Sequence, residues 1–212
     1  TPYLAEIMDS LSEHSSVSEV VFVKSVQVGA TEVMYNWLGY IMHHLANKDA
    51  LVVVPTKEFR NQKFNPRFGR MLDECQVIKD LVTFASRNKR NTEDILEYGA
   101  GAKIIKAGAN VSTDLRSDPV SYVVCDEVDE FPTEIPGSGD PMTLIEGRQT
   151  TFSRAKTFLV STPKLEDTPR IWAAWLKTDQ RHYHLPCPHC GELQHLEWGG
   201  PDQAYGLKRS VA

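Results

Sequence analysis

In this 212-residue chain, the stretch VVFVKSVQVGAT at residues 20–31 predicts a strand, a loop and a helix in succession. Its first four residues are β-branched or aromatic, which predicts a short buried strand. This strand runs directly into a loop that ends in the letters GAT, where we expect a helix to begin. A second apolar stretch, VSYVVCDE at 120–127, ends in the adjacent carboxylates Asp126 and Glu127. Two strands that end in these residue types predict a site for a nucleoside triphosphate.

The loop after the first strand is an irregular version of the phosphate-binding pattern G-x-x-x-x-G-K-[ST]. When the pattern is laid over residues 24–31, Gly29 and Thr31 stand in their usual places. Lys24 occupies the first glycine position, and Ala30 occupies the usual lysine position. Because such a loop folds back round the phosphates, an ammonium group at its start can still reach the β- and γ-phosphate oxygens. The alternative is that Lys24 is a solvated residue at a strand end and that GAT is ordinary helix-start chemistry.

The two carboxylates at the end of the second strand favour a P-loop ATPase. Like charges at the end of a buried strand repel each other and lose hydration, so an ordinary strand would avoid them. A Mg²⁺ ion held near Thr31 and Asp126 would compensate the first carboxylate, and Glu127 could then orient or deprotonate the attacking water. The alternative is a merely acidic turn, because Asp129 and Glu130 continue the run.

The order of the expected elements predicts an α/β fold. Strands and helices alternate along the chain, which favours a RecA-like P-loop ATPase core with a mainly parallel sheet flanked by helices. We expect strands at 20–23, 50–54, 120–125 and 157–160, a hairpin of 94–97 and 103–107, and helices at 2–11, 31–46, from 57 onward and at 141–149. Ligands of such sheets bind at the carboxyl ends of the strands, where Lys24, Asp126 and Ser161 all fall.

The composition is that of an ordinary globular protein. Apolar residues make up 41% and charged residues 24% of the chain, and its length allows one substantial core with a small appendage. No apolar run approaches the roughly 20 residues that span a bilayer, and no leader segment opens the chain, so we expect a cytoplasmic setting without membrane contact. In that setting Cys75 and Cys125 are interpreted as small buried apolar residues.

Several motifs together resemble the large subunit of tailed-phage terminases. These motifs are KSVQVGAT, the DEVDEFP run at 126–132 and STPK at 161–164. The lambda-type branch, with its displaced loop lysine, is the nearest likeness. The N-terminal TPYLAEIMDSLS and the CPHCGE segment at 187–192 look like the same branch. The resemblance extends from Thr1 to about Trp198 and rests on the combination and order of these five motifs.

The resemblance implies roles for individual residues. Lys24 is similar to the family's phosphate-loop lysine, Thr31 to its Mg²⁺ hydroxyl, and Asp126 and Glu127 to its metal-binding and catalytic carboxylates. The residues expected to contact ATP are Lys24, Ser25, Gln27, Gly29, Ala30, Thr31, Asp126, Ser161 and Thr162. Ser161 and Thr162 look like the coupling motif, a loop that senses the γ-phosphate and transmits hydrolysis to DNA movement. The alternative for this motif is a strand-ending turn, which Ser, Thr and Pro favour anyway.

Three arginines and one tyrosine are further candidates. Arg148 is our first choice for an arginine finger that stabilises transition-state charge, ahead of Arg116 and Arg170. Each of them could equally pair with one of the many carboxylates nearby. Tyr3 could stack on adenine, as upstream aromatic residues do in related motors, or could simply pack the N-terminal segment.

The resemblance implies that such a motor moves duplex DNA. The net charge of −5 argues mildly against permanent nucleic-acid binding. A motor that releases DNA in every cycle can work with local basic patches. The candidates are Lys57, Arg60, Lys63, Arg67 and Arg70, which recur at helical spacing, and the group Arg87, Lys89 and Arg90. A basic helical face is more often a solvated face.

The C-terminal tail carries half of a zinc site. Cys187 and Cys190 form a C-x-x-C-G knuckle, but a closed structural zinc site needs four ligands. The ligands that could complete it are His182, His184, His189 and His195, or a second knuckle that the family has further downstream. We therefore expect a P-loop ATPase domain at 1–180 and a linker with a partial zinc-ribbon-like segment at 181–212. No nuclease domain is expected in this length.

These expectations combine into one function. The resemblance implies the ATPase motor domain of a terminase, which uses ATP and Mg²⁺ to package double-stranded viral DNA into a procapsid. The implied partners are the terminase small subunit, the portal protein and further copies of the chain in a ring, in the bacterial host cytoplasm and transiently at the portal. The alternatives are a helicase-like P-loop ATPase and a non-catalytic nucleotide-binding prophage remnant.

Overall fold

The computed structural model describes residues 2–45, 47–86, 91–164, 169–195, 197 and 199. The chain forms two compact units, Thr1–Thr178 and Asp179–Ala212. Within the described residues no helix has the length and apolar character needed to cross a membrane.

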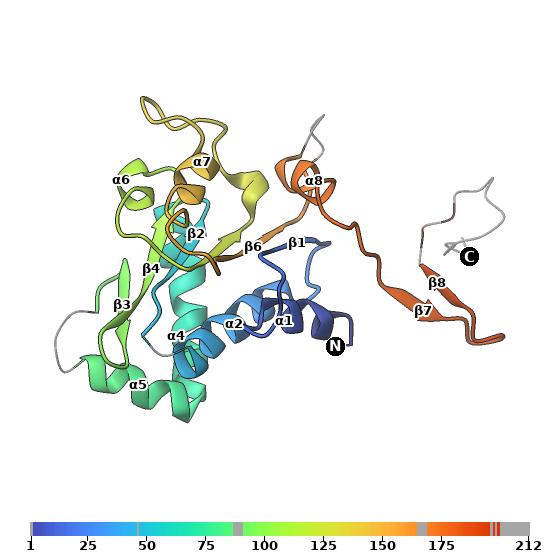
Figure 1. Cartoon of the computed structure of the whole chain (residues 1–212), viewed down its shortest axis with the longest axis horizontal. Coiled ribbons are helices and arrows are strands. Elements are labelled where there is room, and N and C mark those ends of the chain that lie inside the picture. The colour runs from blue at the N-terminus through green and yellow to red at the C-terminus, as the bar shows by residue number, and fades with distance from the viewer. Residues whose placement is uncertain are drawn as a thin grey trace. The chain divides into compact units, whose positions relative to one another are not determined.

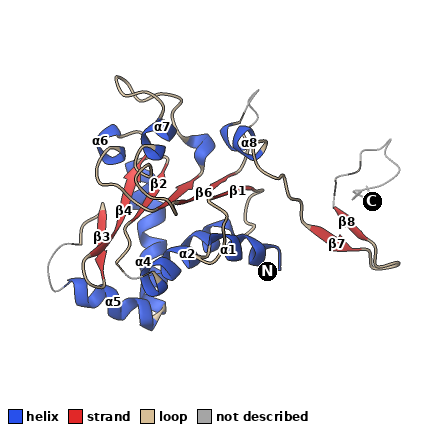
Figure 2. Cartoon of the chain, in the orientation of Figure 1, coloured by secondary structure: helices blue, strands red, loops and turns tan. Residues whose placement is uncertain are grey.

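The first unit is built on a six-stranded sheet (Figure 2). Its strands lie in the order β1 (Glu19–Val23), β6 (Lys156–Ser161), β5 (Tyr122–Asp126), β2 (Ala50–Val54), β4 (Ala102–Gly108) and β3 (Ile95–Tyr98). All neighbours are parallel except β3, which pairs with β4 in the antiparallel sense. The predicted α/β fold with a mainly parallel sheet is confirmed. The predicted hairpin exists, and its second strand also joins the main sheet.

Helices cover both faces of this sheet (Figure 1). On one side lie α1 (Ala5–Leu11), α2 (Ala30–His44), α4 (Asn65–Glu74) and α5 (Gln76–Ser86), and on the other lie α6 (Ser112–Leu115), α7 (Pro141–Glu146) and α8 (Arg170–Trp175). Alternate residues of one strand therefore enter two different cores. Val52 and Val54 pack in the core under α2, whereas Leu51 and Val53 pack in the core under α7 and α8. This double burial explains why every position of β2 is buried and apolar.

The helix after β2 differs from the expected regular helix. It begins as α3 (Lys57–Phe59), with Thr56 Oγ1 accepting the Phe59 N–H at its N-cap, and continues through a π-helical turn, Arg60–Phe64, into α4. The predicted helix 31–46 ends at His44, and Ala46 lies outside the described residues. The predicted helix 141–149 already ends at Glu146.

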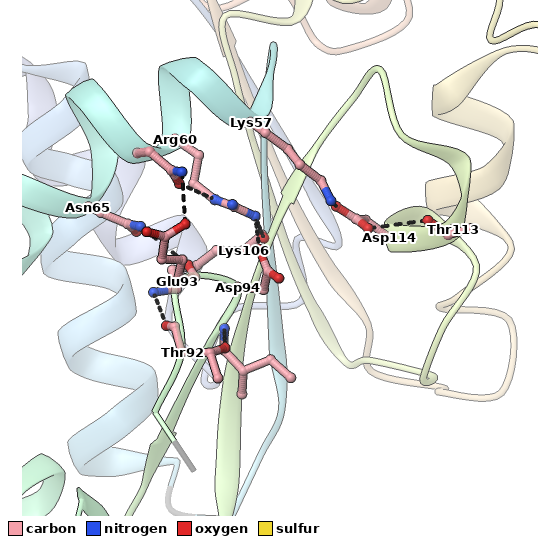
Figure 3. A network of polar contacts seen from close by, with 11 residues as sticks. Lys57, Arg60, Asn65, Thr92, Glu93, Asp94, Lys106, Thr113 and Asp114 are labelled. Atoms are coloured by element: carbon pink, nitrogen blue, oxygen red, sulfur yellow. Dashed lines mark hydrogen bonds and ion pairs between the residues drawn. The ribbon is translucent and has the colours of Figure 1, made fainter. Parts of the chain in front are cut away.

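The π-helical turn changes which side chains face inward. Arg60 is only 2% exposed, pairs with Asp94 and donates from Nη1 to the carbonyl oxygen of Lys106 at 3.0 Å (Figure 3). Lys57 instead pairs with Asp114, with 3.2 Å between Nζ and Oδ2 (Figure 3). The prediction that five basic residues form one DNA-facing stripe is therefore wrong at Arg60, because a helix with an inserted π turn does not keep the regular spacing.

Candidate nucleotide-binding site

The functional residues are brought together by the register of β1, β6 and β5. Val23 is level with Ser161 across the β1–β6 pair, and Asp126 is level with Val160 across the β6–β5 pair. The carboxyl ends of the three strands therefore meet at one edge of the sheet, where ligands of open α/β sheets bind. Since β6 lies between the other two, the loop that follows Ser161 starts between the phosphate loop and the two carboxylates.

The phosphate loop occupies residues 24–29, between β1 and α2. Gln27 and Gly29 both have left-handed backbones, with φ of 60° and 84°. A side chain at Gly29 would also place its Cβ 3.2 Å from Cδ1 of Leu4, so glycine suits both the turn and the N-terminal segment packed on it. The loop leads into the N-terminus of α2, a 15-residue helix whose dipole favours an anion.

The displaced lysine points into the site. Lys24 Nζ donates to Glu127 Oε1 at 2.6 Å and to Thr162 Oγ1 at 2.9 Å, and its side chain is only 8% exposed. Its main-chain N–H donates to the carbonyl oxygen of Ser161 at 3.1 Å, which continues the β1–β6 pairing by one residue. Lys24 is thus not the solvated strand-end residue of the alternative interpretation.

Glu127 follows β5 directly and has a left-handed conformation with φ of 53°, which is uncommon outside glycine and asparagine. Its Oε2 accepts from the Thr162 N–H at 3.2 Å and from Ser161 Oγ at 3.4 Å. The carboxylate is therefore fixed from two sides, by Lys24 and by the loop after β6. Strained non-glycine backbones of this kind concentrate at functional sites.

Asp126 carries a carboxylate that protein groups satisfy only in part. The residue is 5% exposed, and its Oδ1 has no hydrogen-bond partner in the described structure. Burial raises the pKa of Asp126 to about 7, with a further contribution from Glu127, while Lys24 and Arg67 oppose the rise. A buried oxygen ligand without a partner fits a divalent cation such as Mg²⁺, which binds one or two carboxylates together with phosphate oxygens.

Thr31, the predicted second metal ligand, lies in the first turn of α2, directly after the phosphate loop. Burial raises the pKa of Tyr35, and the charge of Asp126 adds to the rise. Thr31 lies one helical turn before Tyr35 on α2, and residues four apart share one face of a helix. Arg67 lowers the pKa of both Asp126 and Tyr35. From its sequence position Arg67 is predicted only as a DNA contact, since no local pattern links α4 to β5.

Ser161, the last residue of β6, adds further hydrogen bonds to the site. Ser161 is fully buried, and its hydroxyl accepts the Asp129 N–H at 3.2 Å in addition to contacting Glu127. The structure therefore brings together Lys24, Glu127, Ser161 and Thr162 from three strands. It also adds Asp129, which in the sequence is recognisable only as part of an acidic run.

The comparison with known families agrees with this geometry. Residues 1–208 match the family described as phage terminase large subunit gpA, ATPase domain. The chain belongs to this family.

Two curated relatives, both named "Terminase, large subunit", also match the chain. They come from Enterobacteria phage P21 and Escherichia phage lambda, and each is 25% identical to this terminase ATPase domain across 98% of its length. The chain spans about a third of the length of these relatives, 32% in each case. The predicted likeness to lambda-type terminases is confirmed.

Solved terminase structures share the fold. The HK97 bacteriophage large terminase superposes with a TM-score of 0.64 at 13% identity, covering 82% of this chain and 35% of that one. The ATPase domain of the Thermus phage P74-26 large terminase gives a TM-score of 0.56 at 15% identity, covering 92% and 81%. At these identities the likeness concerns the fold alone.

The structure does not bring Arg148, our first choice for the arginine finger, to the phosphate loop. Its carbonyl oxygen accepts the Val120 N–H, which places its backbone beside the amino end of β5, at the edge opposite Asp126. Its buried guanidinium donates to the carbonyl oxygens of Asp118 at 2.7 Å and Asp114 at 3.2 Å. These contacts contradict a catalytic finger within this domain and give Arg148 the role of holding the chain that leads into β5.

The other two arginines also contact main-chain carbonyls. Arg116 is exposed and reaches Ser138 O at 3.4 Å. Arg170 donates to Val128 O and Pro132 O and pairs with Asp140 at 3.1 Å. Neither contact reaches the residues that surround Lys24.

Tyr3 binds the phosphate loop through its hydroxyl. The hydroxyl donates to the carbonyl oxygen of Val28 at 2.8 Å, so the N-terminal segment is anchored on the loop in this terminase domain. The packing interpretation therefore has direct support, and stacking on adenine stays a prediction. The basic group at 87–90 lies outside the described residues.

The second unit contains a short hairpin, β7 (His184–Pro186) and β8 (Leu193–His195), with the cysteine knuckle as its turn. Cys187 and Cys190 are free thiols, and N–H groups of Cys190 and His189 lower the pKa of Cys187. Across the described ranges no three His, Cys, Asp or Glu side chains gather to hold a metal ion. Zinc binding therefore stays a prediction with two candidate ligands.

Proposed function

We propose that this chain is the ATPase motor of a phage terminase large subunit and hydrolyses Mg²⁺-ATP to drive double-stranded DNA into a procapsid. The observation that carries the proposal is the meeting of Lys24, Glu127 and Thr162 at the carboxyl ends of β1, β5 and β6. A cation, a carboxylate and a hydrogen-bonding loop at one sheet edge are the parts that phosphoryl transfer to water requires.

In the binding step, the polyphosphate of ATP lies in the loop between β1 and α2. The residues that hold ATP are Lys24, Ser25, Gln27, Gly29, Ala30 and Thr31. Thr31 and Asp126 would hold Mg²⁺, which when bound neutralises charge on the β- and γ-phosphate oxygens. Asp126 fits this role because its buried Oδ1 has no protein partner in the described structure.

In the chemical step, Glu127 orients or deprotonates the attacking water. Its carboxylate is held by Lys24 on one side and by the Thr162 N–H on the other, so its orientation is set before the reaction begins. Lys24 places its ammonium where negative charge develops on the γ-phosphate. Ser161 and Thr162 contact both residues and would sense the loss of the γ-phosphate.

The partners follow from the family. Duplex DNA, the terminase small subunit, the portal protein and further copies of the chain in a ring are the proposed partners, in the bacterial host cytoplasm and at the procapsid portal. We assign no nuclease step to these residues, because the match is to an ATPase domain.

The test is steady-state Mg²⁺-ATP hydrolysis by the intact chain, Lys24→Ala and Glu127→Gln, each with and without duplex DNA. Turnover in the intact chain that both substitutions remove supports the proposal. Turnover that survives Lys24→Ala contradicts the displaced-lysine site. Directional movement on intact duplex supports packaging, whereas strand separation supports a helicase-like ATPase, and nucleotide binding without turnover supports the non-catalytic remnant.

A further inference from the structure

Asp129 connects three segments that are far apart in the sequence. Its Oδ1 accepts the Ile171 N–H at 2.7 Å, and its Oδ2 accepts the Lys164 N–H at 3.1 Å. One carboxylate thus holds both the end of the loop after β6 and the first turn of α8. These are charge-assisted bonds to main-chain donors, which are about twice as strong as neutral ones.

The same residue is joined to Glu127 through Ser161. The Asp129 N–H donates to Ser161 Oγ at 3.2 Å, and the same hydroxyl lies 3.4 Å from Glu127 Oε2. The Thr162 N–H binds that oxygen as well, at 3.2 Å. A continuous series of hydrogen bonds therefore runs from the Glu127 carboxylate through Ser161 and Asp129 to α8.

The position of α8 depends on this series and on apolar packing against the core. Ile171 is fully buried in the core on that side of the sheet. Arg170 fastens the same turn to the segment after Glu127, through the carbonyl oxygens of Val128 and Pro132. A carboxylate beside the N-terminus of a helix is electrostatically favourable, so Asp129 suits this position better than a neutral acceptor would.

We propose that Asp129 is a positioning residue that couples the orientation of Glu127 to the placement of α8. This inference rests on the proposed ATPase function. Glu127 meets the attacking water, whereas Asp129 sets the geometry of the loop that holds Glu127. A change at the γ-phosphate that moves loop 161–164 would therefore also move the first turn of α8, because both are bound by the same carboxylate.

The first test compares Asp129→Ala and Asp129→Asn with Glu130→Ala. Glu130 is the matched control, because it is the adjacent carboxylate and binds the same loop only through a surface ion pair with Lys164 Nζ at 3.2 Å. In Asp129→Ala we expect kcat to fall by roughly 10²-fold, since small misplacements of a catalytic group have effects of that size, while the KM for ATP stays unchanged. Asp129→Asn retains one acceptor oxygen, so its kcat should fall between those of Asp129→Ala and the intact chain. Glu130→Ala should keep the kcat of the intact chain.

The second test does not depend on turnover. Hydrogen–deuterium exchange of the Lys164 amide and of the 170–175 amides is measured with and without Mg²⁺ and a non-hydrolysable ATP analogue. In the intact chain we expect the analogue to change exchange in both segments. In Asp129→Ala the response of 170–175 should be lost, while binding of the analogue and the thermal unfolding transition show that the variant is folded.

The outcomes separate this inference from the function on which it rests. Loss of turnover in Glu127→Gln, with unchanged kcat and unchanged exchange responses in both Asp129 variants, overturns the inference alone. An α8 exchange response that is absent from the intact chain overturns it as well. Turnover that survives Glu127→Gln overturns the proposed function and the inference together.

Discussion

Lys24 Nζ lies 2.6 Å from Glu127 Oε1, although 103 residues separate them in the chain and their strands are not neighbours in the sheet. The contact is possible because β6 lies between β1 and β5 and ends in the small, fully buried Ser161. The lysine at the start of the loop thereby contacts both the residue after β5 and the residue after β6.

Lys24→Ala should weaken ATP binding and remove hydrolysis. The substitution takes the cation from the phosphate oxygens and also leaves the partly buried Glu127 carboxylate without its 2.6 Å partner. Loss of one group that stabilises transition-state charge typically lowers kcat by about 10²–10³-fold. Phosphate release measures turnover, and titration with a fluorescent ATP analogue measures binding. Lys63→Ala, at an exposed position of the π-helical turn, is the control and, measured without DNA, should behave as the intact chain.

Glu127→Gln should retain nucleotide and lose turnover. The amide keeps the size and one acceptor of the carboxylate but cannot take a proton from water, and general-base losses amount to about 10²–10⁴-fold. A binding titration and a single-turnover measurement separate the two effects. Equal losses of binding and of rate would show that Glu127 supports the loop and does not act on water.

Asp126→Asn should raise stability while it weakens the dependence of activity on Mg²⁺. A buried carboxylate charge lowers the free energy of unfolding, and a neutral amide removes that charge, which should raise the free energy of unfolding by about 1 kcal/mol or more. The amide is also a poorer Mg²⁺ ligand, so a higher Mg²⁺ concentration should be needed for half-maximal turnover. Thermal unfolding and a Mg²⁺ titration measure the two effects, which should have opposite signs. Removal of Mg²⁺ with a chelator should stop turnover in the intact chain.

Arg148→Ala should lower stability and leave the chemistry intact. The substitution removes two charged donors from the carbonyl oxygens of Asp114 and Asp118, and hydrogen bonds of this type contribute about 1.5–3 kcal/mol each. Urea unfolding should therefore show a lower free energy of unfolding, whereas kcat per folded molecule at low temperature should be unchanged. Arg116→Ala, which loses only a surface contact, is the matched control. A selective loss of kcat in a stable Arg148→Ala protein would restore the finger interpretation.

Lys106 should make the free energy of unfolding rise with pH above about 8. Burial lowers the pKa of Lys106 to about 8, with help from Arg60 and against the charges of Asp94 and Glu93. In the unfolded chain its pKa is near 10.4, so unfolding takes up a proton between these values. The unfolded state binds more protons there, and the free energy of unfolding rises by at most about 1.4 kcal/mol per pH unit.

Lys106→Met removes this titration while keeping an unbranched chain of similar length. Urea unfolding from pH 7.5 to 9.5 should show a smaller rise with pH than in the intact chain. Lys63→Met, at the exposed turn, should keep the full rise. Identical slopes for the intact chain and Lys106→Met would contradict a lowered pKa at this lysine.

Local features of the sequence were enough to predict the strands of the sheet and most residues of the candidate site. The apolar runs at 20–23, 50–54, 120–125 and 157–160 coincide with strands β1, β2, β5 and β6 to within a few residues. They are recognisable because a strand covered by helices on both faces must be apolar at successive positions. Residues that follow such strands in a parallel sheet lie at one edge, so the placement of Lys24, Asp126 and Ser161 could be predicted.

The α/β class, the phosphate loop and the residue types at the strand ends could therefore be predicted from neighbours in the chain, since strand patterns and loop motifs are local. The tertiary structure alone decided that β6 separates β1 from β5, that Arg60 and Arg148 are buried, and that Asp129 holds α8. Each of these depends on contacts between residues far apart in the sequence, and a charged side chain turns inward only where a distant segment supplies a carboxylate or main-chain carbonyls to receive it.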